Sequence, residues 1–420
     1  RFGKVWKCFL IYYDQNSLIL KKPSFYMPTQ NLTNAKKAKN DEFYTQYHYI
    51  EKEVAAYIEC NPDVFRGKTI LSPCDDPEWS NFTKFFSQNF QKLGLKKFIS
   101  TSYAMDSKNH KSNYQPSLFE SNDPQYDKSK TNKKGKIFTL TRDITGDGII
   151  NFEDIEWQYL DGDGDFRSDE VKQLREEADI IITNPPFSLF RDFLSWVFET
   201  NKDLLVIGNM NAITYKEVFP LIKKNQLWLG ATNFNTGMYF LVSKDFVYAD
   251  TYKFDREQNG LKVNRVPGVC WFSNINHGRR QQSLALMTME ENLKYSKHKE
   301  IKGKKSYDHY DNYEAIEVPF TSSIPSNYKG LMGVPISFLD KYSPEQFDIL
   351  GSDAYDGSPP TKKYSKKTKV VNGKKMKSNT GTMGCVIRED DFGVGTYFDV
   401  GYPVRAVYKR IFIKNKKITK

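Results

Sequence analysis

The sequence predicts an α/β fold in which a parallel sheet is followed by a second, less regular region. Short apolar runs alternate with helical segments between residues 41 and 242, an order typical of parallel sheets. After about residue 250 this order gives way to short strands, aromatic residues and turns. The chain has 420 residues, which is too long for one ordinary domain and sufficient for two.

The elements of the predicted sheet follow one another along the chain. We expect strands at residues 68–72, 97–103, 179–183, 204–208 and 238–242. We expect helices within residues 41–65, 82–93, 171–178, 189–199 and 215–224, where apolar side chains recur at helical spacing. A polar insertion at residues 106–160 interrupts the order. The first domain is therefore expected over residues 27–250 and the second over residues 251–420.

The composition excludes several classes of protein. No run of about 18 or more uncharged apolar residues occurs, so no membrane-spanning helix is predicted. The cysteines are scattered and form no CxxC pair, which argues against a disulfide scaffold or a structural zinc site and fits a reducing cytoplasm. The 62 Lys and Arg residues outnumber the 51 Asp and Glu residues, and this excess favours a polyanionic partner.

The N-terminal stretch predicts no secretory signal. The chain begins at Arg1, and no small-residue cleavage site follows the apolar residues Val5–Tyr13. We expect Met27 to be the natural start, with residues 1–26 as upstream or remnant sequence. An ordinary extra strand and turn is the alternative.

Positive charge is concentrated near the C-terminal end. Residues 353–420 hold 16 Lys or Arg residues and 6 Asp or Glu residues, against a net charge of +11 for the whole chain. Within this region, residues 361–381 are rich in Lys, Gly and Ser and predict a mobile basic loop. We expect this loop to contact phosphates, and a solvated surface loop is the alternative.

The most informative motif is Asn184-Pro185-Pro186-Phe187, which directly follows a predicted strand. Ligands of open α/β sheets bind beyond the carboxyl ends of the strands. The two prolines fix the backbone and remove two N–H donors, which leaves the Asn184 amide oxygen and the Pro185 carbonyl as adjacent acceptors. An exocyclic amine has two hydrogens to give to such a pair, and Phe187 can stack on its ring. A turn without catalytic function is the alternative.

Two adjacent acceptors suit methyl transfer to an amine. The lone pair of an sp² amine is delocalised into its ring, so the amine is a poor nucleophile. The acceptors draw the amine towards tetrahedral geometry, and they stabilise the positive charge that develops as a methyl group arrives. This chemistry requires no general base with a shifted pKa.

Five sequence blocks carry a resemblance to a known family. They are KNDEFYTQY (39–47), CDDPEWSNF (74–82), GDGDFRSDE (162–170) with TNPPFSLFRDF (183–193), GNMNAITYKEVF (208–219) and GLMGVPISFLDKYSPEQF (330–347). In this order the chain resembles the EcoRI-type adenine-specific DNA methyltransferases, with the cofactor blocks before the catalytic loop, the arrangement called gamma. The resemblance implies a Rossmann-like S-adenosylmethionine-dependent methyltransferase sheet with a C-terminal mixed target-recognition region.

The same resemblance implies a role for individual residues. The catalytic residues would be Asn184, Pro185, Pro186 and Phe187. The cofactor would be held by Phe43, Thr45, Cys74, Asp75, Asp76, Asp165 and Phe166, with Thr45 at its methionine moiety, Asp165 at its adenine amine and Phe166 beside its ring. The usual glycine-rich turn is absent after residues 68–72, and no carboxylate for the ribose hydroxyls is evident. Helix capping is the alternative role for Thr45.

The implied substrate is double-stranded DNA, and the implied activity is site-specific N6-methylation of adenine. The enzyme would be the modification enzyme of a restriction–modification system in the cytoplasm of a bacterium or encoded by a phage, with a cognate endonuclease as a partner but no stable complex. The target adenine must leave the base stack. The expected DNA contacts are Arg279, Arg280, Lys362, Lys363, Lys366, Lys367, Lys374 and Lys375.

Alternative functions share part of this evidence. Similar catalytic loops serve enzymes that methylate glutamine side chains of proteins or bases of RNA. A cytosine-N4 enzyme ranks lower because it usually carries Ser in place of Asn184. A non-catalytic DNA-binding protein with a degenerate methyltransferase fold is a further alternative, supported by the missing glycine-rich turn.

A separate acidic run resembles a calcium-binding loop. Between Asp143 and Asp154, oxygen-bearing side chains occupy loop positions 1, 3, 5, 9 and 12, and Gly148 occupies position 6. The expected ligands are Asp143, Asp147, Asn151 and Asp154. Any Ca²⁺ bound there would be structural, and an acidic surface turn is the alternative.

Overall fold

The computed structural model describes residues 44–75, 80–104, 123–232, 234, 236–242, 253–258, 261–353, 359–376, 383–387 and 395–416. The expected start at Met27 with its upstream residues 1–26 lies outside these residues. So do Phe43 and Asp76 of the expected cofactor site, and residues 105–122, which include the first part of the insertion.

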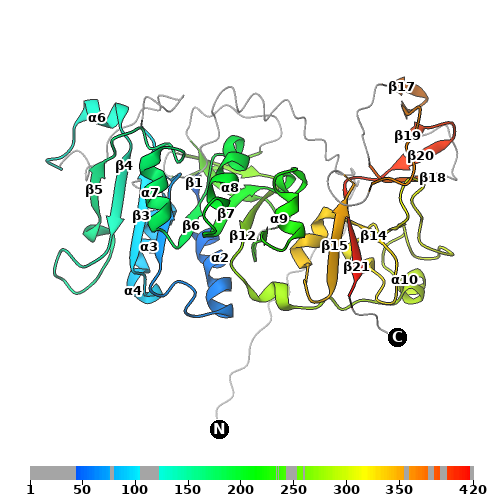
Figure 1. Ribbon diagram of the computed structural model, residues 1–420, viewed down its shortest axis with the longest axis horizontal. Helices are drawn as coiled ribbons and strands as arrows, with labels where there is room; N and C mark the ends of the chain where they lie inside the picture. The colour runs from blue at the N-terminus through cyan, green and yellow to red at the C-terminus, as the bar shows by residue number, and fades with distance from the viewer. Residues whose placement is uncertain are drawn as a thin grey trace, which may run out of the picture.

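An eight-stranded mixed sheet forms the centre of the first part of the chain (Figure 1). Its strand order is β5-β4-β3-β2-β6-β7-β12-β8. The strands are β2 (Thr69–Ser72), β3 (Lys97–Ser102), β4 (Lys136–Leu140), β5 (Glu156–Tyr159), β6 (Ile180–Thr183), β7 (Asp203–Asn209), β8 (Trp228–Leu229) and β12 (Val269–Ser273). The central strands β3, β2, β6 and β7 are parallel, and the outer strands are antiparallel to their neighbours. The predicted α/β class is confirmed.

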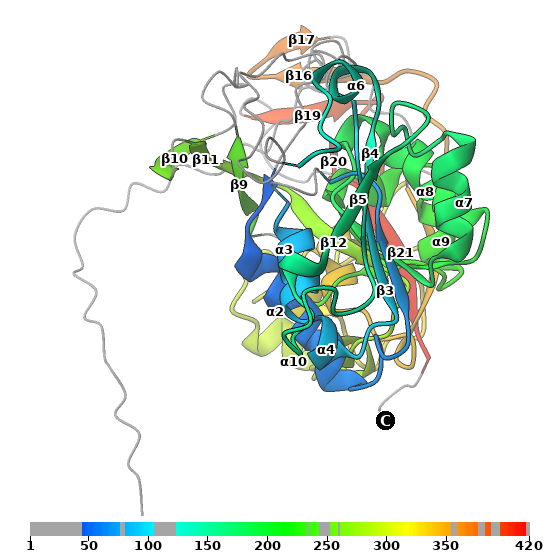
Figure 2. The ribbon, with the colours of Figure 1, turned by 90° about the vertical axis from the view of Figure 1, so that its left-hand side faces the viewer.

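Helices cover both faces of this sheet (Figure 2). One face packs against α2 (Tyr47–Cys60), α3 (Asn81–Gln88) and α4 (Phe90–Leu93), and the other packs against α7 (Asp169–Glu177), α8 (Phe190–Phe198) and α9 (Phe219–Lys223). Successive side chains of a strand point to opposite faces, so Ile180 and Ile182 join the first core while Ile181 joins the second. Burial on both faces explains why the central strands are continuous apolar runs.

Two predicted elements differ from the structure. The strand at residues 238–242, β9 (Met238–Val242), does not join the parallel sheet. It pairs with β1 (Tyr44–Thr45) and β11 (Leu261–Val266), and β10 (Lys253–Gln258) completes this second sheet. Because Tyr44 and Thr45 are paired with β9, the first helix begins only at Tyr47. Periodicity along a segment does not reveal its pairing partner.

The described part of the insertion enlarges the main sheet. The short helix α6 (Lys128–Lys133) leads into β4, and β4 and β5 form the antiparallel edge next to β3. This insertion is therefore part of the fold and not only a surface loop.

The rest of the chain forms two more sheets (Figure 1). The four-stranded sheet has the order β13-β14-β21-β15, and the five-stranded sheet has the order β17-β16-β19-β20-β18. Their bounds are β13 (Ile316–Glu317), β14 (Met332–Pro335), β15 (Phe347–Ser352), β16 (Thr368–Val371), β17 (Lys374–Met376), β18 (Cys385–Ile387), β19 (Thr396–Asp399), β20 (Pro403–Ala406) and β21 (Arg410–Asn415), and α10 (Met289–Tyr295) precedes them. The main sheet extends past residue 250, because β12 pairs with β7.

A buried carboxylate, Glu53, ties α2 to the chain that follows β8. Its side chain is fully buried and accepts hydrogen bonds from the Ala231 amide at 2.7 Å and from the Thr232 hydroxyl at 2.5 Å. Burial disfavours the charged form and raises the pKa of Glu53 to about 7, although these hydrogen bonds oppose the shift.

We predict that Glu53→Gln changes how stability depends on pH. The native state holds a proton on Glu53 that the unfolded state releases, so this contribution is complete below pH 4.5 and is lost as pH rises to about 7. The loss amounts to about 3 kcal/mol at most. Chemical denaturation between pH 4.5 and 8 should show a flatter profile for the variant than for the wild type. The exposed Glu51→Gln on the same helix is the control, and an equal decline in all three proteins would contradict the prediction.

Candidate active site

The predicted catalytic loop lies at the carboxyl end of β6, in the centre of the parallel strands. Asn184 follows the last strand residue directly and is 8% exposed. The chain then turns through Pro185 and Pro186 into η3 (Phe187–Leu189), which leads into α8. This position is where open α/β sheets bind their ligands.

The two expected acceptors, the Asn184 amide oxygen and the Pro185 carbonyl, belong to neighbouring residues of this loop. The Pro186 carbonyl accepts a hydrogen bond of 2.9 Å from the Leu189 amide, which closes the first turn of η3. Among the described residues, no hydrogen bond uses the Pro185 carbonyl. Pro185 therefore offers the carbonyl that is adjacent to the Asn184 amide.

A threonine that the sequence analysis did not single out, Thr183, joins the loop Asn184–Phe187 to the first expected cofactor loop, which follows β2. The hydroxyl of Thr183, the last residue of β6, donates a hydrogen bond of 2.6 Å to the carboxylate of Asp75. Below it, the Ser72 hydroxyl donates to the carbonyl of Ile182 at 2.6 Å. Because β2 and β6 are neighbouring parallel strands, their carboxyl ends bring these residues together. In the sequence, only its position directly before Asn184 could have indicated that Thr183 belongs to the site.

The segment expected to form the N-terminal cofactor block, which includes Thr45, reaches the same edge through β9. Phe187, which is partly exposed, contacts Phe240 of β9 edge-to-face, with 6.5 Å between the ring centroids. Phe240 is the strand partner of Thr45 in β1. The Thr45 hydroxyl is buried and has no hydrogen-bond partner among the residues that the structure describes. A buried hydroxyl without a partner is costly, so this atom is suited to a ligand.

Asp165 is held at the end of β3 by a close backbone contact. Gly164 has a φ of +85°, and a Cβ there would lie 2.1 Å from the Ser102 carbonyl oxygen, so only glycine fits. The Tyr103 hydroxyl donates to Asp165 at 3.4 Å. Two nitrogens of Arg167 donate to its carboxylate at 2.9 and 2.6 Å. Burial alone would raise the pKa of Asp165, but the hydrogen bonds and charge of Arg167 hold it below its usual value.

Cys74 lies beside the carboxylates of this site. Burial raises the pKa of its thiol well above the usual value, and the negative charges of Asp75 and Asp165 raise it further. The thiol is therefore neutral, and the structure brings Cys74, Asp75 and Asp165 to one edge of the sheet. Phe166 is instead buried against Phe193 and Trp196 of α8, so its ring anchors the backbone next to Asp165.

The acidic loop at residues 143–154 directs its carboxylates to its own backbone. Asp154 accepts hydrogen bonds from the amides of Ile144, Thr145 and Asn151, and the amide of Thr145 contributes most to lowering the pKa of Asp154 to about 2. Asp143 likewise accepts from the amides of Gly146 and Gly148. Among the described residues, no group of three or more His, Cys, Asp or Glu side chains is placed to hold a metal ion. The calcium interpretation of Asp143, Asp147, Asn151 and Asp154 therefore has no support.

The two arginines expected to contact DNA take part in internal packing. Arg280 is 8% exposed, stacks on the Trp228 ring at 3.6 Å and is hydrogen-bonded to Asn225. Arg279 donates to the Ala231 carbonyl at 2.5 Å and to Asp340 at 3.1 Å. Arg279 thereby joins the chain after β8 to Asp340, and Arg280 packs on β8 itself. We do not include either side chain in the DNA surface proposed below.

The six lysines expected to contact DNA form two groups. In the first group, Lys362 donates a hydrogen bond to Asp311, and Lys367 lies over the ring of Phe398 in β19. The other group comprises Lys363, Lys366, Lys374 and Lys375, which are exposed, as Lys362 is. In the described part of the chain, no helix is long and apolar enough to cross a membrane.

Known proteins resemble this chain over most of its length. Residues 31–416 match the family described as adenine-specific methyltransferase EcoRI. Type II methyltransferase M.EcoRI of Escherichia coli is 39% identical over 76% of this chain and 88% of that protein. Type II methyltransferases M.MpnI of Mycoplasma pneumoniae and M.MgeORF184P of Mycoplasma genitalium are 33% and 35% identical, over 83% and 85% of their own lengths. No solved structure matches significantly. The chain therefore belongs to the EcoRI family of adenine-specific methyltransferases.

Proposed function

We propose that this adenine methyltransferase methylates N6 of an adenine that is flipped out of duplex DNA, at a specific site. The observation that carries the proposal is the loop Asn184–Phe187, which stands at the carboxyl end of β6 and is joined through Thr183 to Asp75. In keeping with the Type II relatives, the methylation would protect DNA from a restriction endonuclease of the same specificity.

The chemistry follows from the two acceptors of the loop. The Asn184 amide oxygen and the Pro185 carbonyl each accept one hydrogen of the adenine amine, which localises its lone pair. They also stabilise the positive charge that develops on N6, and water accepts the proton that is finally lost. Phe187 is partly exposed next to the loop and can stack on the flipped base. Flipping costs a few kcal/mol, which contacts in this pocket and along the DNA backbone offset.

The residues at the edge of the sheet fit S-adenosylmethionine. When bound, this cofactor supplies an electrophilic methyl group on a sulfonium sulfur. The buried Thr45 hydroxyl would meet its methionine moiety, and Asp165, kept charged by Arg167, would accept from its adenine amine. Asp75 is fixed by Thr183 and would orient the first cofactor loop beside them.

The direct test of the function is transfer of a labelled methyl group from S-adenosylmethionine to unmethylated DNA, followed by digestion to nucleosides. Label in N6-methyl-2′-deoxyadenosine is the expected result. Label in RNA or in protein glutamine, with none in DNA, would replace the proposed substrate. Cofactor binding without any transfer would contradict the enzymatic proposal.

We predict that Asn184→Ala removes an acceptor for the amine and lowers kcat by about 100- to 1,000-fold. Cofactor affinity, measured by calorimetry, should remain close to that of the wild type, because the acceptor serves the base and not the cofactor. Turnover within about threefold of the wild type would contradict the assigned role.

We predict that Asp165→Asn weakens cofactor binding by about 10- to 100-fold, since a hydrogen bond to a charged group contributes about 1.5–3 kcal/mol. Calorimetry of the DNA-free enzyme measures this effect without catalysis. Asp169→Asn is the matched control, because Asp169 lies four residues further on and its side chain is 95% exposed. Equal affinities for the two variants would refute the contact.

A further inference from the structure

The Lys-rich segment forms a projecting two-stranded ribbon. The strands β16 and β17 are antiparallel and pair Lys369 with Met376 and Val371 with Lys374. Asn372 and Gly373 connect them with φ values of +47° and +77°, the conformation of a tight type I′ hairpin turn. The segment expected as a mobile loop is therefore, in its described part, a hairpin with a defined register.

Among the residues that the structure describes, the ribbon is attached along one side only. β16 pairs with β19, whereas β17 is the last strand of the five-stranded sheet. All three residues of β17 are exposed. Two of them are the lysines Lys374 and Lys375, and the third, Met376, is 52% exposed. An exposed apolar side chain next to cationic ones is suited to an interface that combines phosphate contacts with an apolar contact.

The base of the ribbon is anchored by the lysines that the sequence had also assigned to DNA. Asp311 accepts hydrogen bonds from Tyr364 at 2.7 Å and from Tyr402 at 2.6 Å, and it pairs with Lys362 at 3.1 Å. The ammonium group of Lys367 lies over the Phe398 ring at 4.9 Å. These contacts hold the chain that leads into β16, so the ribbon projects from a fixed support.

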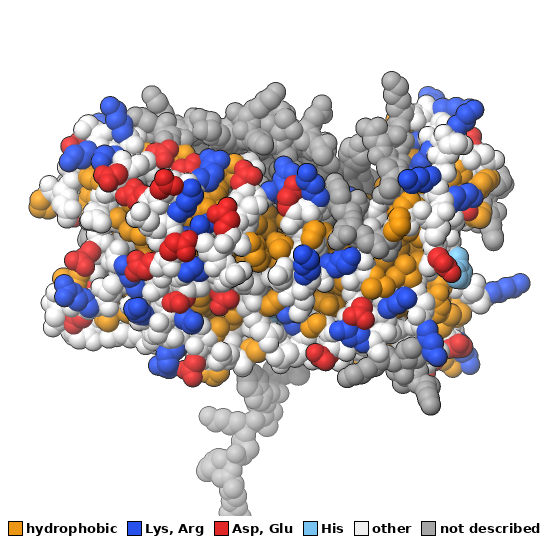
Figure 3. Space-filling model, in the orientation of Figure 1, with side chains coloured by type: hydrophobic (Ala, Val, Ile, Leu, Met, Phe, Trp, Pro, Cys, Tyr) orange, Lys and Arg blue, Asp and Glu red, His pale blue; other side chains and the backbone are white. Residues whose placement is uncertain are grey.

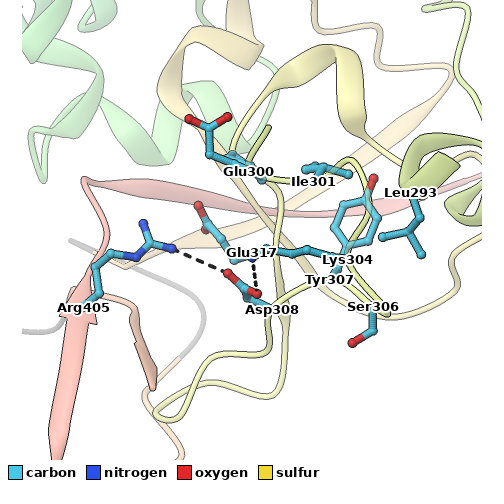
Figure 4. Close-up of a pocket in the computed structure, with 10 residues that line it drawn as sticks. Leu293, Glu300, Ile301, Lys304, Ser306, Tyr307, Asp308, Glu317 and Arg405 are labelled. Carbon is cyan, nitrogen blue, oxygen red and sulfur yellow. Dashed lines mark hydrogen bonds and ion pairs between the residues drawn. The ribbon is translucent and has the colours of Figure 1, made fainter. Parts of the chain in front are cut away.

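The five-stranded sheet is also fixed to its neighbour. Arg405 of β20 pairs with Asp308 at 3.6 Å, and Lys304 pairs with the same carboxylate at 2.6 Å (Figure 4). These residues line a small cavity, and Glu317 at its wall forms an ion pair of 2.7 Å with Arg410. Through Arg405, the ion pairs of Asp308 join β20 of the five-stranded sheet to the segment that precedes β13.

The ribbon faces the same side of the molecule as the active site. α4 lies at the bottom of both ribbon views and leads into β3, so the parallel strands run upwards and their carboxyl ends lie at the top (Figures 1 and 2). β16 and β17 also lie at the top in both views, and Lys and Arg side chains gather over this projection (Figure 3). One duplex can therefore meet both the catalytic loop and the ribbon.

We propose that the β16–β17 ribbon enters the major groove of the substrate DNA, an inference that rests on the proposed function. The major groove admits a two-stranded ribbon. Lys374 and Lys375 would neutralise phosphates at its walls, and Met376 would contact base edges such as the thymine methyl group. Lys362 and Lys367 would act through the support and not through DNA.

The test is the salt dependence of DNA affinity for Lys374→Ala/Lys375→Ala, measured on a duplex that the wild type methylates. Each lost phosphate contact reduces the slope of log affinity against log salt by about 0.9, so we expect a reduction of about two. Lys294→Ala/Lys297→Ala is the matched control, because Lys294 is exposed on α10, at the bottom of both views (Figures 1 and 2). Cofactor affinity and thermal stability verify that the variants are folded.

The variant Met376→Ala distinguishes a contact with base edges in the groove from the electrostatic contacts with phosphates. We expect its salt slope to equal that of the wild type, while its preference for the methylated sequence over unrelated DNA falls by about tenfold, as for one lost base contact. A wild-type slope for the Lys374/Lys375 variant, or an equal drop for the Lys294/Lys297 control, would overturn the ribbon proposal. A wild-type enzyme that does not bind DNA at all would instead overturn the proposed function.

Discussion

The hydrogen bond between Thr183 and Asp75 is the contact on which the arrangement of the active site depends. It joins the last residue of β6 to the loop that follows β2, at the point where the two parallel strands end side by side. The proposed catalytic loop begins at the next residue, Asn184, and the two prolines that follow restrict its backbone. A shift in the cofactor loop would therefore be transmitted to the acceptors for the amine. Methyl transfer needs this coupling, because the reacting atoms must be held within a few tenths of an ångström of alignment.

The site is assembled from segments that lie far apart in the sequence. β1 and β9 bring Thr45 and Phe240 to the catalytic loop, and the close packing of Gly164 on β3 brings Asp165 to the same edge. Thr45 and Phe240 are held by the pairing of β1 with β9, and Asp165 is held by the contact of its loop with the end of β3. The chemistry requires precision and little flexibility here, whereas the DNA must be engaged by a separate surface. We propose the ribbon of β16 and β17, at the far end of the molecule, as such a surface (Figure 1).

The sequence alone predicts those helices and strands that are determined by the pattern of neighbouring residues. The buried strands next to the catalytic loop were predicted within one or two residues, because apolar runs flanked by helices leave few alternatives. Contacts that depend on tertiary pairing were not accessible: β9 was assigned to the wrong sheet, and the packing of Arg280 on Trp228 was not predicted. The hairpin could have been predicted, because Asn372-Gly373 between short β-compatible runs is a strong turn signal.

Substitution of Thr183 tests the coupling of the two loops most directly. Thr183→Val keeps the shape of the side chain and removes its hydroxyl, whereas Thr183→Ser keeps the hydroxyl. The account predicts that the valine variant loses about tenfold in both cofactor affinity and kcat, that the serine variant stays near the wild type, and that Asp75→Asn adds little to the valine variant. A valine variant with wild-type affinity and kcat, or fully additive effects of the two substitutions, would contradict the account.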